Sequence, residues 1–120
     1  KIIKKIKRFK NLEFRSVPEN SYETADSLIF FLKDRNITLK CKKELNKIGI
    51  STKILPEATT WHFAGNWDHI KELKKKHKNL KLSFKKSYNI ISRAISLPIS
   101  VKMNDEIPKK IFKALNKVLV

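Results

Sequence analysis

The chain has 120 residues and a formal net charge of +17 at pH 7. That length suits one domain with a hydrophobic core of its own. No apolar run reaches the roughly 20 residues that span a bilayer, so we expect no membrane helix and no membrane partner. The single cysteine, Cys41, excludes an internal disulfide and favours a reducing, cytoplasmic location.

The first ten residues, KIIKKIKRFK, have the pattern of an amphipathic helix. Their apolar residues fall close to one helical stripe, formed by Ile2, Ile3, Ile6 and Phe9. No capping residue precedes the stripe, so we expect residues 1–10 to be the end of an interdomain helix in a longer protein. A disordered start or a trimmed tag is the alternative. In a piece of a longer protein, this stripe is where we expect exposed apolar surface.

Two strands are predicted in the next segment. Residues 12–17 alternate apolar and polar side chains, as a half-buried strand does. A turn-rich link follows at residues 18–24. The continuous apolar run at residues 27–33 predicts a central strand that is buried on both faces.

A helix over residues 38–48 and a strand over residues 50–55 come next. Cys41 lies beside the predicted inner stripe of this helix, which holds Leu39, Lys42, Leu45 and Ile48. Gly49 is suited to end the helix as its C-cap, and the apolar Ile50 follows it.

The following segment is less regular. Residues 56–66 have no clear period, and residues 67–76 favour a short helix whose charged run is a solvated face. Residues 94–99 predict a short strand with an edge-breaking proline. Between them, residues 84–93 predict a helix whose inward side holds Phe84, Tyr88 and Ile91.

The last helix is predicted after Met103. Asn104 is a suitable N-cap, and Pro108 is tolerated in a first turn. The buried stripe of this helix holds Ile107, Ile111, Leu115 and Val118. The order of elements predicts an α+β fold in a single domain over residues 1–120, with a small, mostly antiparallel sheet and helices packed on one face.

The positive charge raises the question of a nucleic-acid partner. Lysine supplies 24 of the 28 basic residues, and the chain is also rich in isoleucine, with 15, and asparagine, with 9. This pattern indicates a drift in composition, and arginine, which reads guanine edges and stacks on bases, is scarce. We therefore interpret the lysines as solvated surface and expect no nucleic acid.

Two other classes of protein remain open as alternatives. The first is a basic module for nucleic acid or another polyanion, in which the basic run at residues 74–78 contacts phosphates and Trp61 or Trp67 stacks on bases. The second is a protein–protein or regulatory domain of similar α+β build.

Few residues have a pattern suited to metal or covalent chemistry. The three histidines, His62, His69 and His77, have no carboxylate or thiol at a zinc-like spacing, so no metal site is predicted. Cys41 lies inside a predicted helix and is interpreted as a core residue rather than a nucleophile. No catalytic residue is assigned in this chain.

The most unusual segment is the loop LPEATTWHFAGNWDHI at residues 55–70. Both tryptophans of the chain, Trp61 and Trp67, flank His62 and Asn66 there. Loops that combine aromatic and amide side chains often bind ligands. The alternative is that the loop seals one end of the core through Trp61, Phe63 and Trp67.

Three further segments carry a resemblance, namely KELNKIGISTKIL at 43–55, ISLPIS at 95–100 and MNDEIPKKIFKAL at 103–115. In this order they resemble the C-terminal small domain of the DegT/StrS family, fold-type-I aminotransferases that use pyridoxal phosphate on keto sugars. The loop WHFAGNWDHI is similar to the branch that aminates an eight-carbon keto-sugar acid, an octulosonate. The sequence departs from the family at residues 100–102, where a proline-glycine or similar turn is common.

The resemblance implies a division of labour in a longer enzyme. The lysine that holds pyridoxal phosphate and the other catalytic groups belong to a large N-terminal domain, so this piece alone is expected to be inactive. It is expected to cover the cofactor cleft and to line the substrate site with Trp61, His62, Asn66, Trp67 and Arg93. Arg93 is expected to hold an acidic group of the sugar, or alternatively to form a salt bridge.

The resemblance also implies partners and a process. The expected partners are a keto sugar, an amino donor, for which we expect glutamate, and a second subunit in a homodimer of the full-length enzyme. The expected process is the biosynthesis of cell-surface polysaccharide such as lipopolysaccharide.

Overall fold

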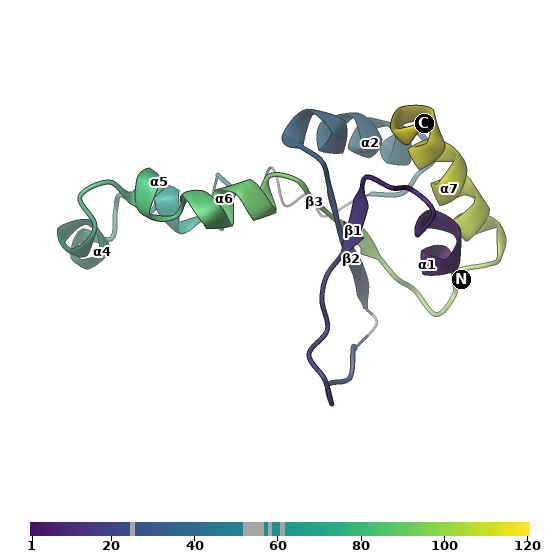
Figure 1. Cartoon of the computed structure of the whole chain (residues 1–120), viewed down its shortest axis with the longest axis horizontal. Coiled ribbons are helices and arrows are strands. Elements are labelled where there is room, and N and C mark those ends of the chain that lie inside the picture. Colours follow the sequence, from purple (N-terminus) through teal and green to yellow (C-terminus); the bar gives the residue numbers. More distant parts are fainter. Residues whose placement is uncertain (25, 52–56, 58, 61) are drawn as a thin grey trace.

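The computed structural model describes residues 1–24, 26–51, 57, 59–60 and 62–120. Within them it has three strands, six α-helices and one short 3-10 helix, η1 (Figure 1). The predicted α+β class is confirmed. The elements in chain order are α1 (Ile2–Ile6), β1 (Leu12–Phe14), β2 (Ser27–Leu32), α2 (Arg35–Lys47), η1 (Ala64–Asn66), α4 (Lys71–Lys76), α5 (Leu80–Ser83), α6 (Lys85–Ile91), β3 (Ala94–Pro98) and α7 (Glu106–Leu119).

The sheet has the order β1-β2-β3, and both pairs are antiparallel. Phe30, in the middle of β2, pairs with Ile95 of β3, and the predicted central position of β2 is confirmed. Its predicted burial on both faces is wrong. Phe30 and Leu32 are buried, whereas Ile29 and Phe31, which alternate with them and point to the other face, are half-buried.

Both outer strands begin where predicted, and β1 is only half of its predicted length. β1 ends at Phe14, three residues before the predicted end of this strand. β3 ends at Pro98, which suits an outer strand because proline has no N–H to donate to a further strand. Edge proline and short edge strands both limit pairing with other chains.

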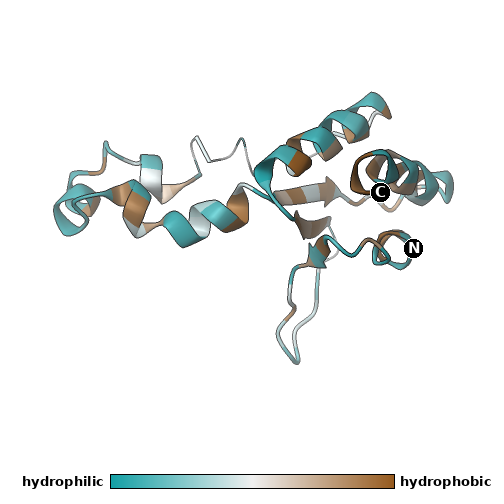
Figure 2. Ribbon diagram, turned by 45° about the horizontal axis from the view of Figure 1, so that its top comes forward, coloured by the Kyte–Doolittle hydropathy of each residue, from teal (hydrophilic) through white to brown (hydrophobic). Residues whose placement is uncertain are grey.

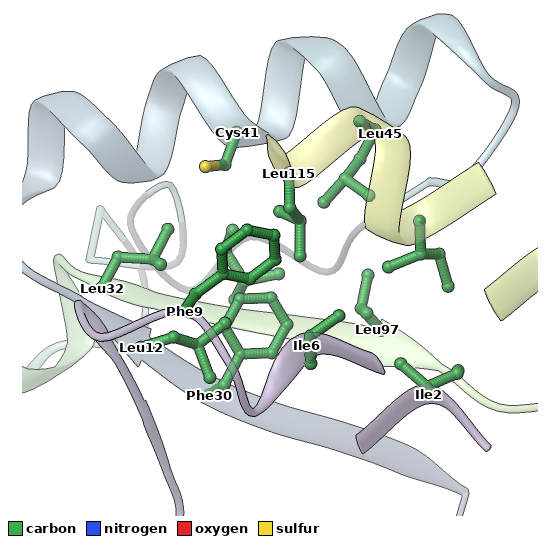
Figure 3. Packing of buried hydrophobic residues seen from close by; sticks show 13 residues of the cluster. Ile2, Ile6, Phe9, Leu12, Phe30, Leu32, Cys41, Leu45, Leu97 and Leu115 are labelled. Carbon is green, nitrogen blue, oxygen red and sulfur yellow. The ribbon is translucent and has the colours of Figure 1, made fainter. Parts of the chain in front are cut away.

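Helices cover one face of this sheet. α2 packs against α7 and also contacts β2 and β3, while α1 packs on α7 (Figure 1). Between helices and sheet lies a cluster of buried side chains, contributed by the two ends of the chain (Figure 3). Its members are Ile2, Ile6, Phe9, Leu12, Phe30, Leu32, Cys41, Leu45, Ile95, Leu97, Ile111, Ala114 and Leu115.

The N-terminal segment belongs to this core. Ile2 and Ile6 are buried, and the ring of Phe9 stacks on Phe112 with centroids 5.2 Å apart. Within the predicted stripe, Ile3 differs, because 45% of it is exposed. The expectation that the stripe forms exposed apolar surface is therefore wrong, since three of its four members pack against α7 and the sheet.

Both ends of α2 have a clear physical cause. Asp34 Oδ1 accepts a hydrogen bond from the N–H of Ile37 at 2.9 Å, so the helix begins at residue 35 instead of the predicted 38. Gly49 has a φ of +77°. The N–H groups of Gly49 and Ile50 donate to carbonyls of the last turn at 3.0 and 3.1 Å, which is a Schellman motif. The predicted glycine C-cap is confirmed.

The buried side of α2 differs from the predicted stripe. Thr38, Cys41 and Leu45 are buried, while Leu39 and Lys42 are half-buried. Thr38 is acceptable in the core because its Oγ1 donates to the carbonyl of Asp34 at 2.7 Å. The buried side therefore lies one residue before most of the predicted stripe, and the interpretation of Cys41 as a core residue is confirmed.

The last helix, α7, agrees with its prediction. Asn104 Oδ1 accepts hydrogen bonds from two N–H groups of the first turn, at 3.1 and 3.3 Å. Pro108 lies in that turn, where a missing N–H costs little. Ile111 and Leu115 of the predicted stripe are buried, and its other two members are half-buried.

The described residues between Glu57 and Ile91 form a unit that we call the arm. The arm contains η1, α4, α5 and α6 and extends away from the sheet (Figure 1). The radius of gyration is 16.2 Å, against about 14 Å for a compact chain of this length. No described residue of the arm belongs to the core cluster. Hydrophilic residues dominate the far end of the arm (Figure 2).

Two predicted helices change within the arm. The helix predicted over residues 67–76 begins only at Lys71, and its charged run is a solvated face without buried residues, as predicted. The helix predicted over residues 84–93 is α6, preceded by the separate α5. Phe84, just before α6, and Ile91 are half-buried, Tyr88 is exposed, and none of the three belongs to the core cluster, so the predicted inward side of this helix does not reach the core.

Two remaining expectations concern single segments. Most of the strand predicted over residues 50–55 lies outside the described residues. In the part of the chain that the structure describes, no helix is long and apolar enough to cross a bilayer.

Burial of Cys41 predicts an inert thiol. Burial raises the pKa of this thiol to about 12, and the thiolate is the reactive form. Because the pKa in the folded state lies above its unfolded value, this group favours folding below about pH 8.5, and the contribution is lost as the pH rises further. We expect negligible labelling by a disulfide reagent at about pH 8 and full labelling in urea. Rapid labelling without denaturant would contradict the packing of α2.

Candidate functional site

The unusual loop lies in the arm and has a small core of its own. Phe63 is only 3% exposed, and Leu80 of α5 is buried beside η1. The rings of Phe63 and Tyr88 have centroids 5.6 Å apart and an interplanar angle of 58°. The Phe63 ring lies so close to Gly65 that any Cβ there would overlap its carbon atoms. Gly65 therefore permits the close approach that the small core needs.

A pocket of about 370 Å³ lies beside this small core. Aromatic, amide and ammonium groups surround it, from Thr59, Phe63, Asn66, Lys81, Lys85 and Tyr88. Asn66 Nδ2 donates a hydrogen bond to the carbonyl of Thr59 at 2.5 Å, which fixes the orientation of the amide. An apolar floor with a few oriented polar groups is the usual composition of a site for a small ligand.

The predicted loop residues occupy different positions around η1. Asn66 lines the pocket. His62 is exposed and lies just before η1. Trp67 is half-buried and lies just after η1, and its backbone N–H donates to the carbonyl of Ala64 at 3.2 Å. Trp61 lies outside the described residues. The alternative that the loop seals the main core is wrong for Phe63, which is buried within the arm instead.

Five of the six pocket residues were missed by sequence reasoning, which had named only Asn66 as a site residue. Thr59 and Phe63 lie in the loop at residues 55–70, whereas Lys81, Lys85 and Tyr88 lie outside it. The last three recur at a spacing of four and then three residues, a helical spacing that is visible in the sequence. The helix prediction for that segment placed only Tyr88 of these three on an inward face.

Arg93 lies on the body of the protein, at the start of β3. Both of its Nη atoms are 3.2 Å from Glu13 Oε2, and Nη1 also donates to the carbonyl of Leu32 at 3.0 Å. Its guanidinium carbon is 5.4 Å from the centre of the Phe31 ring. The arginine thus joins all three strands on the face without helices, as the salt-bridge alternative described. Its predicted contact with an acidic sugar group stays a prediction.

Two of the hollows outside the arm have charged groups in their walls. A groove of about 430 Å³ between α2 and α7 is lined by four lysines around Glu44. Lys47 donates to Glu44 Oε1 at 2.5 Å, and Lys117 lies 3.4 Å from Oε2. The hydrogen bond from Lys47 is the main reason that the pKa of Glu44 lies below its usual value.

The second hollow, of about 350 Å³, is predominantly apolar and lies beside α1. Ile2, Ile3 and Leu28 form part of its wall, together with Ile99 and Met103 from the segment after β3. Its rim carries charged groups, including Asp105, whose pKa is lowered by a hydrogen bond from Lys1.

Pyridoxal phosphate needs a lysine, an acid at its ring nitrogen and donors for its phosphate group. The described lining of the arm pocket has no acid, and the acid of the α2–α7 groove is already bound by two lysines. These two hollows therefore do not fit the cofactor as a resident group. They also contain no cluster of three or more metal-ligating side chains. No family model matches the chain.

Replacing Gly65 by alanine is expected to disrupt the arm while sparing the body. The added Cβ would overlap the Phe63 ring, which must then leave its contact with Tyr88. We expect the ring-current shifts of the arm residues to change in NMR spectra, while resonances of β2, β3 and α7 stay in place. The control is Gly49→Ala, which has open space around it but a φ of +77°. That variant is expected to lower body stability by about 1 kcal/mol. Unchanged arm resonances in Gly65→Ala would contradict the geometry of the small core.

The contacts of Arg93 predict that replacing Arg93 lowers the free energy of unfolding more than replacing its partner Glu13. Glu13→Gln removes an exposed charge pair and is expected to cost less than about 1 kcal/mol of unfolding free energy. Arg93→Ala also leaves the Leu32 carbonyl without its side-chain donor, and is expected to cost about 1–3 kcal/mol. Urea unfolding of both variants measures the difference. Equal losses would show that the carbonyl contact contributes nothing.

Proposed function

We propose that this chain is the C-terminal small domain of a pyridoxal-phosphate-dependent sugar aminotransferase of the DegT/StrS type. The longer enzyme would transfer an amino group from glutamate to a keto sugar, in the cytoplasm, during the biosynthesis of cell-surface polysaccharide. The loop WHFAGNWDHI is similar to the branch of the family that aminates an octulosonate. We therefore propose a keto-sugar acid as the substrate. The full-length enzyme would act as a homodimer.

The observation that supports this proposal best is the way the three family-like segments come together. The segment at 43–50 forms the last turns of α2 and its Gly49 cap, the segment at 95–100 contains most of β3, and the segment at 103–115 forms most of α7. α2 packs on α7 and contacts β3. The motifs therefore belong to one packed unit and not to three unrelated stretches of surface.

The apolar hollow beside α1 supports the proposal in a second way. A small domain of this kind needs a surface against which the large cofactor-binding domain packs. Ile3 is exposed next to this hollow, and Val101 of the neighbouring loop is also fully exposed. We assign this side of the domain, instead of the whole α1 stripe, to contact with the large domain.

In this account the chain positions substrate and excludes water, and the other domain supplies the bond-making groups. The cofactor provides the electron sink for amino transfer when it is bound to the large domain. Asn66 and its neighbours in the arm pocket would face the sugar. Closing such a wall over a reaction site strengthens the polar interactions inside it.

A basic polyanion-binding module is the second candidate function. The observation in its favour is the groove between α2 and α7, where Lys40, Lys43, Lys47 and Lys117 surround a single carboxylate. Such a module would bind through phosphate contacts that weaken steeply with salt.

An absorbance spectrum separates these candidates. The full-length protein, purified with pyridoxal phosphate, is expected to show a band near the visible edge that shifts when glutamate is added. The 120-residue chain is the control and is expected to show no glutamate-dependent change, although its lysines can react with free cofactor. Absence of a band in the full-length protein, with salt-sensitive retention of the chain on a polyanion column, would favour the second candidate.

A further inference from the structure

Two lysines of the arm line the pocket from adjacent helices. The N–H of Phe84 donates to the carbonyl of Leu80 at 3.0 Å, and the N–H of Tyr88 donates to the carbonyl of Phe84 at 3.0 Å. Both bonds end at Phe84, the residue that separates α5 from α6. Lys81 of α5 and Lys85 of α6 lie on either side of it, and both line the pocket.

Among the described residues, neither of these two ammonium groups has a counter-charge within ion-pair distance. Most described lysines share this property, since six lysines have a carboxylate partner, but Lys81 and Lys85 also line one pocket together. The described residues that line this pocket include no aspartate or glutamate. Two like charges at one pocket repel each other, and an anion bound between them would relieve this repulsion.

The rest of the pocket is suited to a sugar ring and not to a bare ion. Phe63 and Tyr88 supply apolar ring surface on its wall. The Asn66 amide is held in one orientation by the Thr59 carbonyl, so it is preorganised for hydrogen bonding. Apolar surface, an oriented amide and two cations together match a ligand with C–H faces, hydroxyl groups and one negative group.

We propose that the arm pocket binds a carbohydrate that carries an anionic group, with Lys81 and Lys85 holding that carboxylate or phosphate. The inference rests on the proposed function, in which this loop faces the sugar, and it names the substrate class. In this inference the two arm lysines, and not Arg93, bind the negative group of the sugar, because the guanidinium of Arg93 already bonds to Glu13 and to the carbonyl of Leu32. Lysines bind such groups as point charges, so either anion fits.

The test is an NMR titration of the 120-residue chain with three sugars that differ in charge. Glucuronate carries a carboxylate, glucose 6-phosphate carries a phosphate, and glucose is neutral, while all three have the same pyranose ring. We expect one or both anionic sugars to shift the backbone amide signals of Phe63, Asn66 and Tyr88 in the millimolar range, with glucose binding roughly tenfold more weakly or not at all. The stronger of the two anions identifies the group.

Matched variants test the assignment to the two lysines. Lys81→Gln and Lys85→Gln are each expected to weaken binding of the anionic sugar roughly tenfold. Lys86→Gln is the control, because it removes the same charge from the same helix but does not line the pocket. The spectra themselves report whether each variant is folded. Failure of both anionic sugars to bind, equal binding of glucose, or an equal loss in Lys86→Gln would each overturn the inference.

The outcome is separable from that of the proposed function. If the full-length protein gives the glutamate-dependent band but the titration fails, the enzyme class stands and the substrate contact is wrong. If the titration succeeds and the band is absent, the pocket binds an anionic sugar in a protein of another class.

Discussion

The antiparallel pairing of β2 with β3 is the constraint on which the rest of the structure depends. It joins residues 27–31 to residues 94–98. The core therefore forms only when the N-terminal part of the chain, up to α2, meets the C-terminal part, from β3 onward. Once they meet, α7 lies on α2, and α1 lies on α7. The chain between these two strands is long, and its described residues from Glu57 to Ile91 extend away from the sheet as the arm. The entropy lost on closing such a long loop grows only slowly with length, so the excursion is tolerated.

This arrangement gives the body and the arm separate apolar cores. The body buries apolar side chains from both ends of the chain, whereas the arm relies on a small core around Phe63 and Leu80. An ion pair between Lys42 and Glu57 joins the arm to α2, but no described arm residue belongs to the core of the body, so the arm can carry uncompensated charge. Lys81 and Lys85 are such a case, and a segment with few buried contacts is also free to adjust to a ligand. The same logic places functional residues on loops that a rigid scaffold positions.

Helix ends with strong local signals could be predicted from the sequence, but which side of a helix is buried could not. Gly49 and Asn104 end and begin helices through backbone chemistry that short sequence patterns specify, and both predictions are confirmed. The face of α2 was misjudged because Thr38 becomes buried once its hydroxyl bonds to the backbone. The pocket was found only in part, through Asn66. Its lysines were missed because nothing local distinguishes a lysine that faces a pocket from one that faces solvent.

Native-state hydrogen exchange tests the central claim, that a body closed by the chain ends carries an arm that opens independently. The account predicts two groups of amides. Those of β2, β3, α2 and α7 should exchange only through global unfolding, and those of η1, α5 and α6 should exchange through a smaller opening with a weaker dependence on denaturant. An anionic sugar should slow the second group alone. Exchange of arm and body in one step, with the same free energy, would contradict the account.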